Sequence, residues 1–141
     1  MTRTDDKVEI AEQLARYSHA VDMFTFDDLK SFFHPDAKAS YLLAAIGAED
    51  IHLDGQAAIV AFLTERMPAQ GAPMPRHGIS NIVVDFADDD TADVRAFLNP
   101  SGSLTGYYRI RFVRTAEGWR ALRFEVQNFR RETPAWAQQK S

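Results

Sequence analysis

The chain has 141 residues, 45% hydrophobic and 26% charged, which fits one globular domain spanning residues 1–141. Its formal net charge of −4 offers no attraction to nucleic acid or to an anionic membrane surface, so we expect neither as a partner. It has no cysteine, which excludes disulfides and zinc–thiolate sites and favours a cytoplasmic location, and no apolar run long enough to span a membrane.

Helical spacing dominates the first part of the chain. A helix is predicted from about residue 5 to residue 23, and Asp22 continues its small or apolar stripe at i+4 spacing. The stripe consists of Val8, Ala11, Leu14, Ala15, Ser18 and Asp22. Thr25 and Asp28 resemble a capping box, which predicts a short second helix from Thr25. The HPD sequence at residues 34–36 should end it, because a residue before proline resists helical geometry.

Strand-like runs follow these helices. A first strand is predicted over residues 38–45 and an extended segment over 51–53, and then a helix over 56–67 with Asp54 as its N-cap. Four more strands are predicted at Gly78–Phe86, Thr91–Leu98, Gly106–Arg114 and Trp119–Phe129. A polar tail occupies about residues 130–141. Helices followed by an antiparallel meander indicate an α+β fold, in which a strongly curved sheet with helices across its open face would enclose a cavity.

Asp22 and His77 are the strongest candidates for chemistry. A carboxylate near a helix C-terminus is unfavourable by a few tenths to about 1 kcal/mol, so Asp22 needs a cation or donors nearby, unless it is exposed and caps the next turn. His77 opens the strand-like run PRHGISNIVVDF and can supply that partner. A carboxylate bonded to one ring nitrogen makes the other a better general base near neutral pH. The alternative is a histidine of the core or rim with a structural hydrogen bond.

Three tyrosines could face the same cavity. Tyr17 lies on the inward half of the first helix, where its hydroxyl could donate to a leaving group or to a carbonyl oxygen. Tyr41 and Tyr108 alternate with apolar residues on predicted strands. Buried tyrosines usually keep a hydrogen-bond partner, so each could equally belong to the core.

Four further residues could bind a substrate. In a strand of period two, Asn81 shares the face of His77. Arg123 is either an outward charge or a cavity cation that stabilises a developing oxyanion. Phe62 and Phe97 would help to shape the pocket, and an aromatic lining suits a small apolar, aromatic or polycyclic ligand.

Several common motifs are missing from the sequence. It contains no HExxH, GxGxxG, P-loop or GxSxG motif and no convincing set of metal ligands. We therefore expect neither a metal nor another cofactor.

Taken together, these residues resemble the SnoaL-like branch of the NTF2-like superfamily, over nearly the whole chain. The segments that carry the resemblance are EQLARYSHAVDMFTFDDLKSFFHPDA, DGQAAIVAFL, PRHGISNIVVDF and TGYYRIRFVRTAEGWRALR. The resemblance implies a cone-shaped α+β barrel, with three helices on a curved mixed sheet, and a homodimer formed through that sheet.

Within this superfamily the chain looks most like scytalone dehydratase, the dehydrochlorinases and bile-acid 7α-dehydratase, which use an Asp–His dyad for elimination without a cofactor. Asp22 and His77 match the dyad positions. Tyr17 matches an active-site tyrosine of the bile-acid enzyme, and Tyr41 one of scytalone dehydratase. Arg123 lies near an arginine that some members carry. The second histidine of scytalone dehydratase has no counterpart in TADVRAFLNPSG, so its substrate is not expected to be shared.

These observations lead to one hypothesis and three alternatives. The hypothesis is a small-molecule lyase, of dehydratase type, or an isomerase, with His77 as base and Asp22 as its partner. The alternatives are a polyketide-cyclase-like enzyme with an aspartate as acid and base, a non-catalytic binding or protein-interaction domain, and the β subunit of a ring-hydroxylating dioxygenase.

Overall fold

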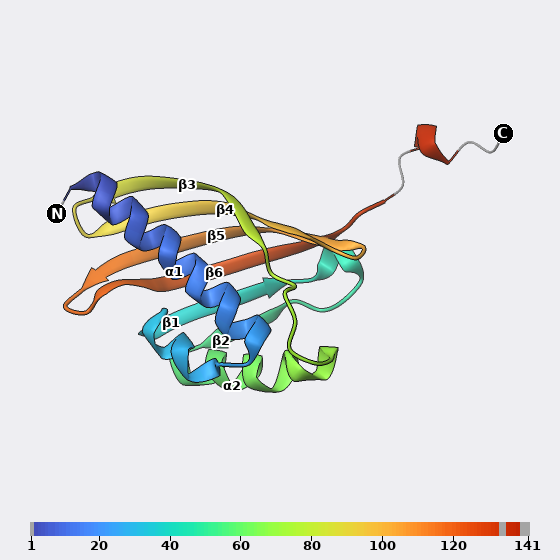
Figure 1. Cartoon of the computed structure of the whole chain (residues 1–141), viewed down its shortest axis with the longest axis horizontal. Helices are drawn as coiled ribbons and strands as arrows, with labels where there is room; N and C mark the ends of the chain where they lie inside the picture. Colours follow the sequence, from blue (N-terminus) through green and yellow to red (C-terminus); the bar gives the residue numbers. More distant parts are fainter. Residues whose placement is uncertain (1, 133–134, 139–141) are drawn as a thin grey trace.

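A six-stranded sheet forms the body of the protein (Figure 1), and the computed structural model describes residues 2–132 and 135–138. The strands are β1 (Phe33–Leu42), β2 (Ile51–Asp54), β3 (Ile79–Asp88), β4 (Thr91–Ser101), β5 (Leu104–Thr115) and β6 (Gly118–Arg130). Their order is β2-β1-β6-β5-β4-β3; β1 and β6 pair in parallel and the other neighbours antiparallel. The predicted α+β fold, with N-terminal helices on a mixed and largely antiparallel sheet, is confirmed.

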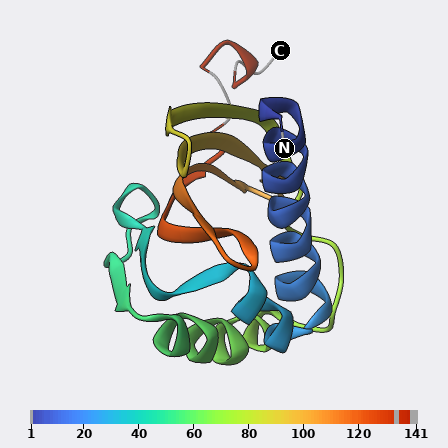
Figure 2. The ribbon, with the colours of Figure 1, turned by 90° about the vertical axis from the view of Figure 1, so that its left-hand side faces the viewer.

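Two α-helices cover the inner face of this sheet. Helix α1 (Arg3–Met23) begins at a capping box formed by Thr2 and Asp5, and it ends where Phe24 adopts a left-handed conformation. Seen from the end in Figure 2, α1 runs along one side of the curled sheet and α2 (Gln56–Arg66) lies beneath it. The 3-10 helices are Phe26–Ser31, Ala44–Ile46, Pro68–Gln70 and Ala135–Ala137. None of the described helices is long and apolar enough to cross a bilayer.

Three predicted details of the element ends were wrong. A short helix does begin after Thr25, as predicted, but it is a 3-10 helix of six residues and the capping box is absent, because Thr25 makes no side-chain cap bond. The HPD sequence lies inside β1, because that strand already pairs with β6 at Phe33 and the register shifts before Lys38. The N-cap of α2 is Gly55 and not Asp54.

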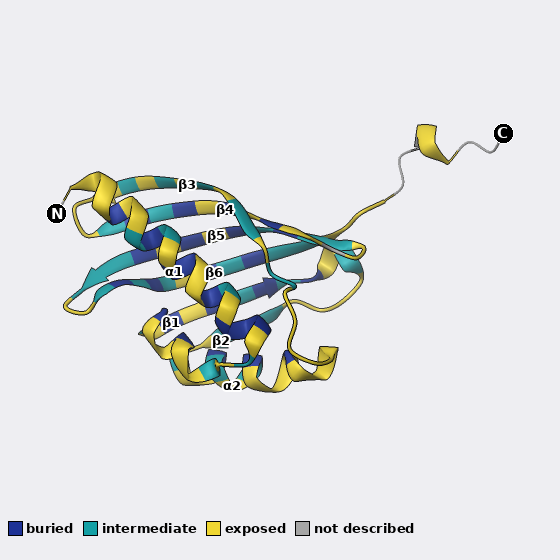
Figure 3. Ribbon diagram, viewed as in Figure 1, coloured by how far each residue is buried: buried dark blue, intermediate teal, exposed yellow. Residues whose placement is uncertain are grey.

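The buried face of α1 is rotated from the predicted stripe. Val8 is 64% exposed, whereas Ile10, Leu14, Tyr17 and Val21 are buried. Figure 3 shows this alternation of buried and exposed turns along the helix. The bulky Tyr17 ring sets the orientation, since it enters an aromatic cluster beneath the helix. The cluster consists of Tyr17, Phe32, Phe33, Tyr108 and Phe124, with Tyr17 centred 5.1 Å from both Phe32 and Phe124.

Two irregularities invert the side-chain alternation of strands. In β3 the register shifts between Ser80 and Val83, and Asn81 has a positive φ of 55°. In β6, Arg123 pairs with Arg111 while Ala121 pairs with Phe112, so Leu122 is an extra residue. An extra residue moves the following side chains to the other face of a sheet.

The C-terminal segment follows β6, which ends at Arg130. Residues 133–134 and 139–141 of the predicted polar tail lie outside the described residues. Trp136, which the structure does describe, is 79% exposed.

Candidate active site

Asp22 and His77 meet where the last turn of α1 faces the segment before β3. The Asp22 Oδ1 and His77 Nδ1 atoms are 2.6 Å apart. The other carboxylate oxygen, Oδ2, accepts hydrogen bonds of 2.7 Å from the backbone N–H groups of Arg76 and His77. The Ser18 hydroxyl donates to the backbone carbonyl of His77. One carboxylate thus holds both the ring and the backbone of the histidine.

These contacts explain how Asp22 is tolerated at its position. Its side chain is only 7% exposed and lies at the C-terminal end of α1, where the helix dipole disfavours a negative charge. The imidazole and two backbone amides provide the compensating donors. Because Nδ1 of His77 faces the carboxylate, Nε2 is the ring nitrogen available to a ligand.

His77 lines a cavity of about 250 Å³ between the sheet, α1 and α2. Four predicted residues line it with His77: Tyr17, Tyr41, Phe62 and Tyr108. The apolar part of the lining is Leu43, Ile46, Ala48, Ile51, Leu63, Met67, Leu98, Leu104 and Val126. The site therefore combines one imidazole and three phenols with a mainly apolar wall.

The three phenols are held in their neutral form. Burial raises the pKa of Tyr17, Tyr41 and Tyr108 above the ordinary value of 10.0. The Asp22 carboxylate also raises the pKa of Tyr17 and Tyr108. The Tyr41 hydroxyl is buried beside that of Tyr17, which lowers the pKa of Tyr41 against the larger effect of burial, but it makes no hydrogen bond of standard geometry with a described residue. A buried donor without a partner is costly, and a ligand oxygen would satisfy it.

Three predicted binding residues lie outside this cavity. Asn81 is exposed in the β3 irregularity, so the period-two argument fails after Ser80. Arg123 is exposed on the outer face because the extra Leu122 reverses the parity set by Ala121. Phe97 is 49% exposed, and its ring is centred 5.9 Å from that of Tyr107. The sequence alternation could not show these reversals.

Sequence reasoning missed three polar residues of the cavity wall: Arg66, Gln70 and Asn128. Asn128 had a usable signal, because it shares the inward parity of Phe124 and Val126 on β6. Arg66 and Gln70 lie at and beyond the end of α2, where local sequence gives no direction.

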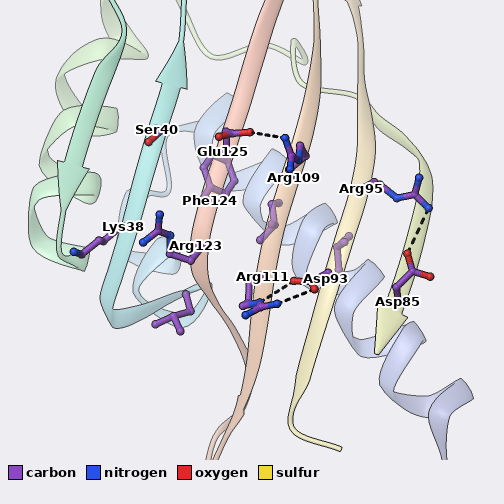
Figure 4. Close-up of a pocket in the computed structure, with 13 residues that line it drawn as sticks. Lys38, Ser40, Asp85, Asp93, Arg95, Arg109, Arg111, Arg123, Phe124 and Glu125 are labelled. Carbon is purple, nitrogen blue, oxygen red and sulfur yellow. Dashed lines mark hydrogen bonds and ion pairs between the residues drawn. The ribbon is translucent and has the colours of Figure 1, made fainter. Parts of the chain in front are cut away.

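The outer face of the sheet carries a larger hollow of about 750 Å³, shown in Figure 4. Its walls are mainly charged, and three ion pairs cross it: Arg95–Asp85, Arg109–Glu125 and Arg111–Asp93. It contains neither His77 nor the tyrosines. In residues 2–132 and 135–138, no three His, Asp or Glu side chains converge as a metal site would require.

Comparison with known sequences gives one family. The SnoaL-like domain matches residues 2–125 of the chain. An uncharacterised protein of Mycobacterium tuberculosis is 33% identical over 129 residues, which cover 84% of this chain and 82% of that protein.

Solved structures share the fold. An NTF2-like protein with a cystatin-like fold from Novosphingobium aromaticivorans has a TM-score of 0.68 at 26% identity, covering 96% of this chain and 88% of that one. A Kribbella flavida protein has a TM-score of 0.75 at 21% identity, covering 98% of this chain and 100% of that one. A second N. aromaticivorans protein, provisionally named a scytalone dehydratase, has a TM-score of 0.68 at 22% identity, with 94% of each chain covered. The last two likenesses show the fold alone.

Proposed function

The chain belongs to the SnoaL-like domain family, with an NTF2-like fold, and we propose that it is a small-molecule lyase or isomerase that works by proton transfer. The observation that carries the proposal is the 2.6 Å contact between Asp22 and a histidine that lines a mainly apolar cavity. Such a dyad suits elimination or isomerisation next to an electron-withdrawing group.

In this proposal His77 is the base. Its Nε2 atom removes a proton from a carbon next to a carbonyl group, and the electrons of the broken C–H bond form an enolate. Asp22 keeps Nδ1 protonated and stabilises the imidazolium. The imidazolium then returns the proton, either to a departing hydroxyl, which leaves as water, or to another carbon of the substrate. All these steps use protein groups alone.

The tyrosines would stabilise the enolate. Because burial keeps the phenols of Tyr17 and Tyr41 protonated, each can donate a hydrogen bond to the developing oxyanion. Tyr108 lines the same cavity and can help to orient the substrate.

Asp22 itself is less suited to direct acid–base work on a substrate. It does not line the cavity, and both of its oxygens accept hydrogen bonds from residues 76 and 77. This arrangement argues against a cyclase mechanism with Asp22 as the acid and base.

The test is a His77→Ala variant with His52→Ala as control, since His52 lies exposed on β2. Small β-hydroxyketones serve as elimination probes, followed by enone absorbance, and deuterium incorporation next to the carbonyl reports proton abstraction. We expect the His77 variant to lose about 10²–10⁴ in rate. Unchanged rates in a folded His77 variant would reject the assignment.

We also propose a homodimer formed through the outer face of the sheet. One row across five strands contains Lys38, Arg123, Arg111, Asp93 and Asp85, so its positive and negative halves are separated. A twofold axis along β5 would place Lys38 and Arg123 of one protomer over Asp85 and Asp93 of its partner. Lys38 and Arg123, both visible in Figure 4, form no ion pair with any described residue. This face is therefore complementary to itself.

Two charge-reversed chains test this dimer by sedimentation. Lys38→Glu/Arg123→Glu and Asp85→Lys/Asp93→Lys should each be monomeric, because like charges would then face each other. An equal mixture should form a heterodimer, because residues 38 and 123 of each chain then face opposite charges at residues 85 and 93 of the other. A monomeric wild-type chain, or variants that still dimerise separately, would contradict the arrangement.

A further inference from the structure

Every polar side chain that lines the inner cavity can donate a hydrogen bond except His77, whose Nε2 atom is unprotonated in the proposed function. The polar groups are the phenols of Tyr17, Tyr41 and Tyr108, the imidazole of His77, the amides of Gln70 and Asn128, and the guanidinium of Arg66. Among the described residues the lining has no carboxylate, and Asp22 lies behind the histidine ring. Such a wall complements an electron-rich or anionic ligand.

Arg66 is the permanent cation of this lining. It lies in the last turn of α2, and its guanidinium carbon is 5.4 Å from the centre of the Phe62 ring. Within the described part of the chain, neither a carboxylate nor a carbonyl oxygen bonds its guanidinium. By contrast, Arg76 nearby donates to the carbonyl oxygens of Ala72 and Gln70.

The position of Arg66 has a structural explanation only in part. A cation in the last turn of a helix is favoured by the dipole, which accounts for its charge. Arg66 is exposed at the rim of the cavity, where water solvates its guanidinium, so an anion in the cavity can reach it without displacing a protein partner. A guanidinium offers paired N–H groups that match the two oxygens of a carboxylate.

We propose that the cavity binds a small organic anion whose carboxylate lies against Arg66 and whose apolar ring enters between Phe62 and the tyrosines. This inference rests on the cavity used in the proposed function and names its substrate class. A cavity of about 250 Å³ is smaller than the usual range for drug-sized ligands, so the ligand has about one or two rings.

Two probes of the same shape test the anion site. 2-Naphthoate is an anion at about pH 7 and 2-naphthol is neutral, since a phenolic pKa lies near 10. Isothermal titration calorimetry should show that the wild-type chain prefers naphthoate. The Arg66→Gln variant should lose that preference by about tenfold or more while its affinity for naphthol stays the same.

Arg16→Gln is the matched control, because Arg16 is exposed on α1 and, within the part of the chain that the structure describes, forms an ion pair with Glu12 alone. It should keep the wild-type preference, and Arg66→Lys should keep part of it. The proposal is overturned if neither probe binds, if wild type shows no preference for naphthoate, or if Arg66→Gln retains it.

The two proposals fail separately. Binding of naphthoate requires no turnover, so the preference should persist in the His77→Ala variant. A preference that depends on Arg66, together with full activity in His77→Ala, would remove the proposed reaction and leave the anion site. If instead His77→Ala lost activity and the wild-type chain showed no preference for naphthoate, the proposed reaction would stand and the anion site would be rejected.

Discussion

Helix α1 carries a buried aspartate near each end, and the two have different partners. Asp6 is 2% exposed and Asp22 is 5% exposed. The Asp6 carboxylate accepts hydrogen bonds of 3.0 Å from both terminal nitrogens of Arg114 and one of 3.1 Å from the indole nitrogen of Trp119. The Asp22 carboxylate is hydrogen-bonded to a titratable imidazole and accepts hydrogen bonds from two backbone amides, and that imidazole lines the inner cavity.

The difference separates a structural site from a chemical one. Arg114 is always charged, so its pair with Asp6 cannot exchange protons near neutral pH. Its guanidinium also lies 4.6 Å from the Trp119 ring and donates to Asp90 and to the carbonyl oxygen of Asp89, so four of its five N–H groups are engaged within the protein. At the other end, His77 keeps Nε2 free beside a cavity. The same residue type on one helix thus fixes the fold at one end and, in the proposed function, orients the catalytic base at the other.

The largest expected effect comes from Asp22→Asn. An asparagine amide at this place donates to Nδ1 of His77 and so shifts the ring proton to Nε2, which can then no longer act as a base. Turnover should fall by about 10²–10⁴. Enone formation from the β-hydroxyketone probes measures it. Asp27→Asn, at a side chain that is 95% exposed, is the control and should leave turnover unchanged.

Asp6→Asn should give the opposite result, with lower stability and normal turnover. Removing the charge leaves Arg114 partly buried without its bidentate partner, which should cost about 2–4 kcal/mol. Urea unfolding measures the loss. The matched change Asp89→Asn affects a side chain that is 96% exposed and should alter stability by less than about 0.5 kcal/mol. Equal stability of both variants would show that the Asp6 pair contributes nothing.

Low pH should remove the contribution of Asp6 to the stability of the fold. The hydrogen bond from Arg114 and that from Trp119 hold the pKa of Asp6 below its ordinary value of 3.8, against the effect of burial. A carboxyl group with a lowered folded pKa contributes stability that is fully present above its unfolded pKa and lost as pH falls through the folded value. The stability gap between wild type and Asp6→Asn should therefore be constant near neutral pH and close below about pH 4. A gap that widens in acid would contradict this sign.

The smallest effect is expected for Tyr41→Phe. Its hydroxyl is buried and makes no hydrogen bond of standard geometry with a described residue, so removing it should change stability by no more than about 1 kcal/mol. Turnover should nevertheless fall about tenfold, since one donor to the enolate is lost. Tyr107→Phe on the outer face is the control for both measurements. If turnover in Tyr41→Phe stayed at the wild-type level, Tyr41 would be a core residue alone.

Local pattern was sufficient for the order of elements and for the meeting of Asp22 and His77. The stripe on α1 placed Asp22 on a side that must find donors, and the run after Pro75 placed a histidine at the start of a strand. Alternation also placed Tyr41 and Tyr108 on the inner face correctly. Asp22, Tyr41 and Tyr108 each lie in a stretch of helix or strand without a register shift.

Only the tertiary structure showed which way side chains point in strands that a register shift interrupts. The irregularity at Asn81 and the extra residue Leu122 reverse the alternation, so Asn81 and Arg123 point away from the cavity. A single sequence cannot show where a strand gains a residue, because the sheet neighbours determine where the register shifts. The same holds for the meeting of Arg66 and Asn128, which come to one cavity wall from α2 and β6. The alternation of β6 places Asn128 on the inner face, but how α2 packs on the sheet brings Arg66 to the same wall, and no local spacing encodes that packing.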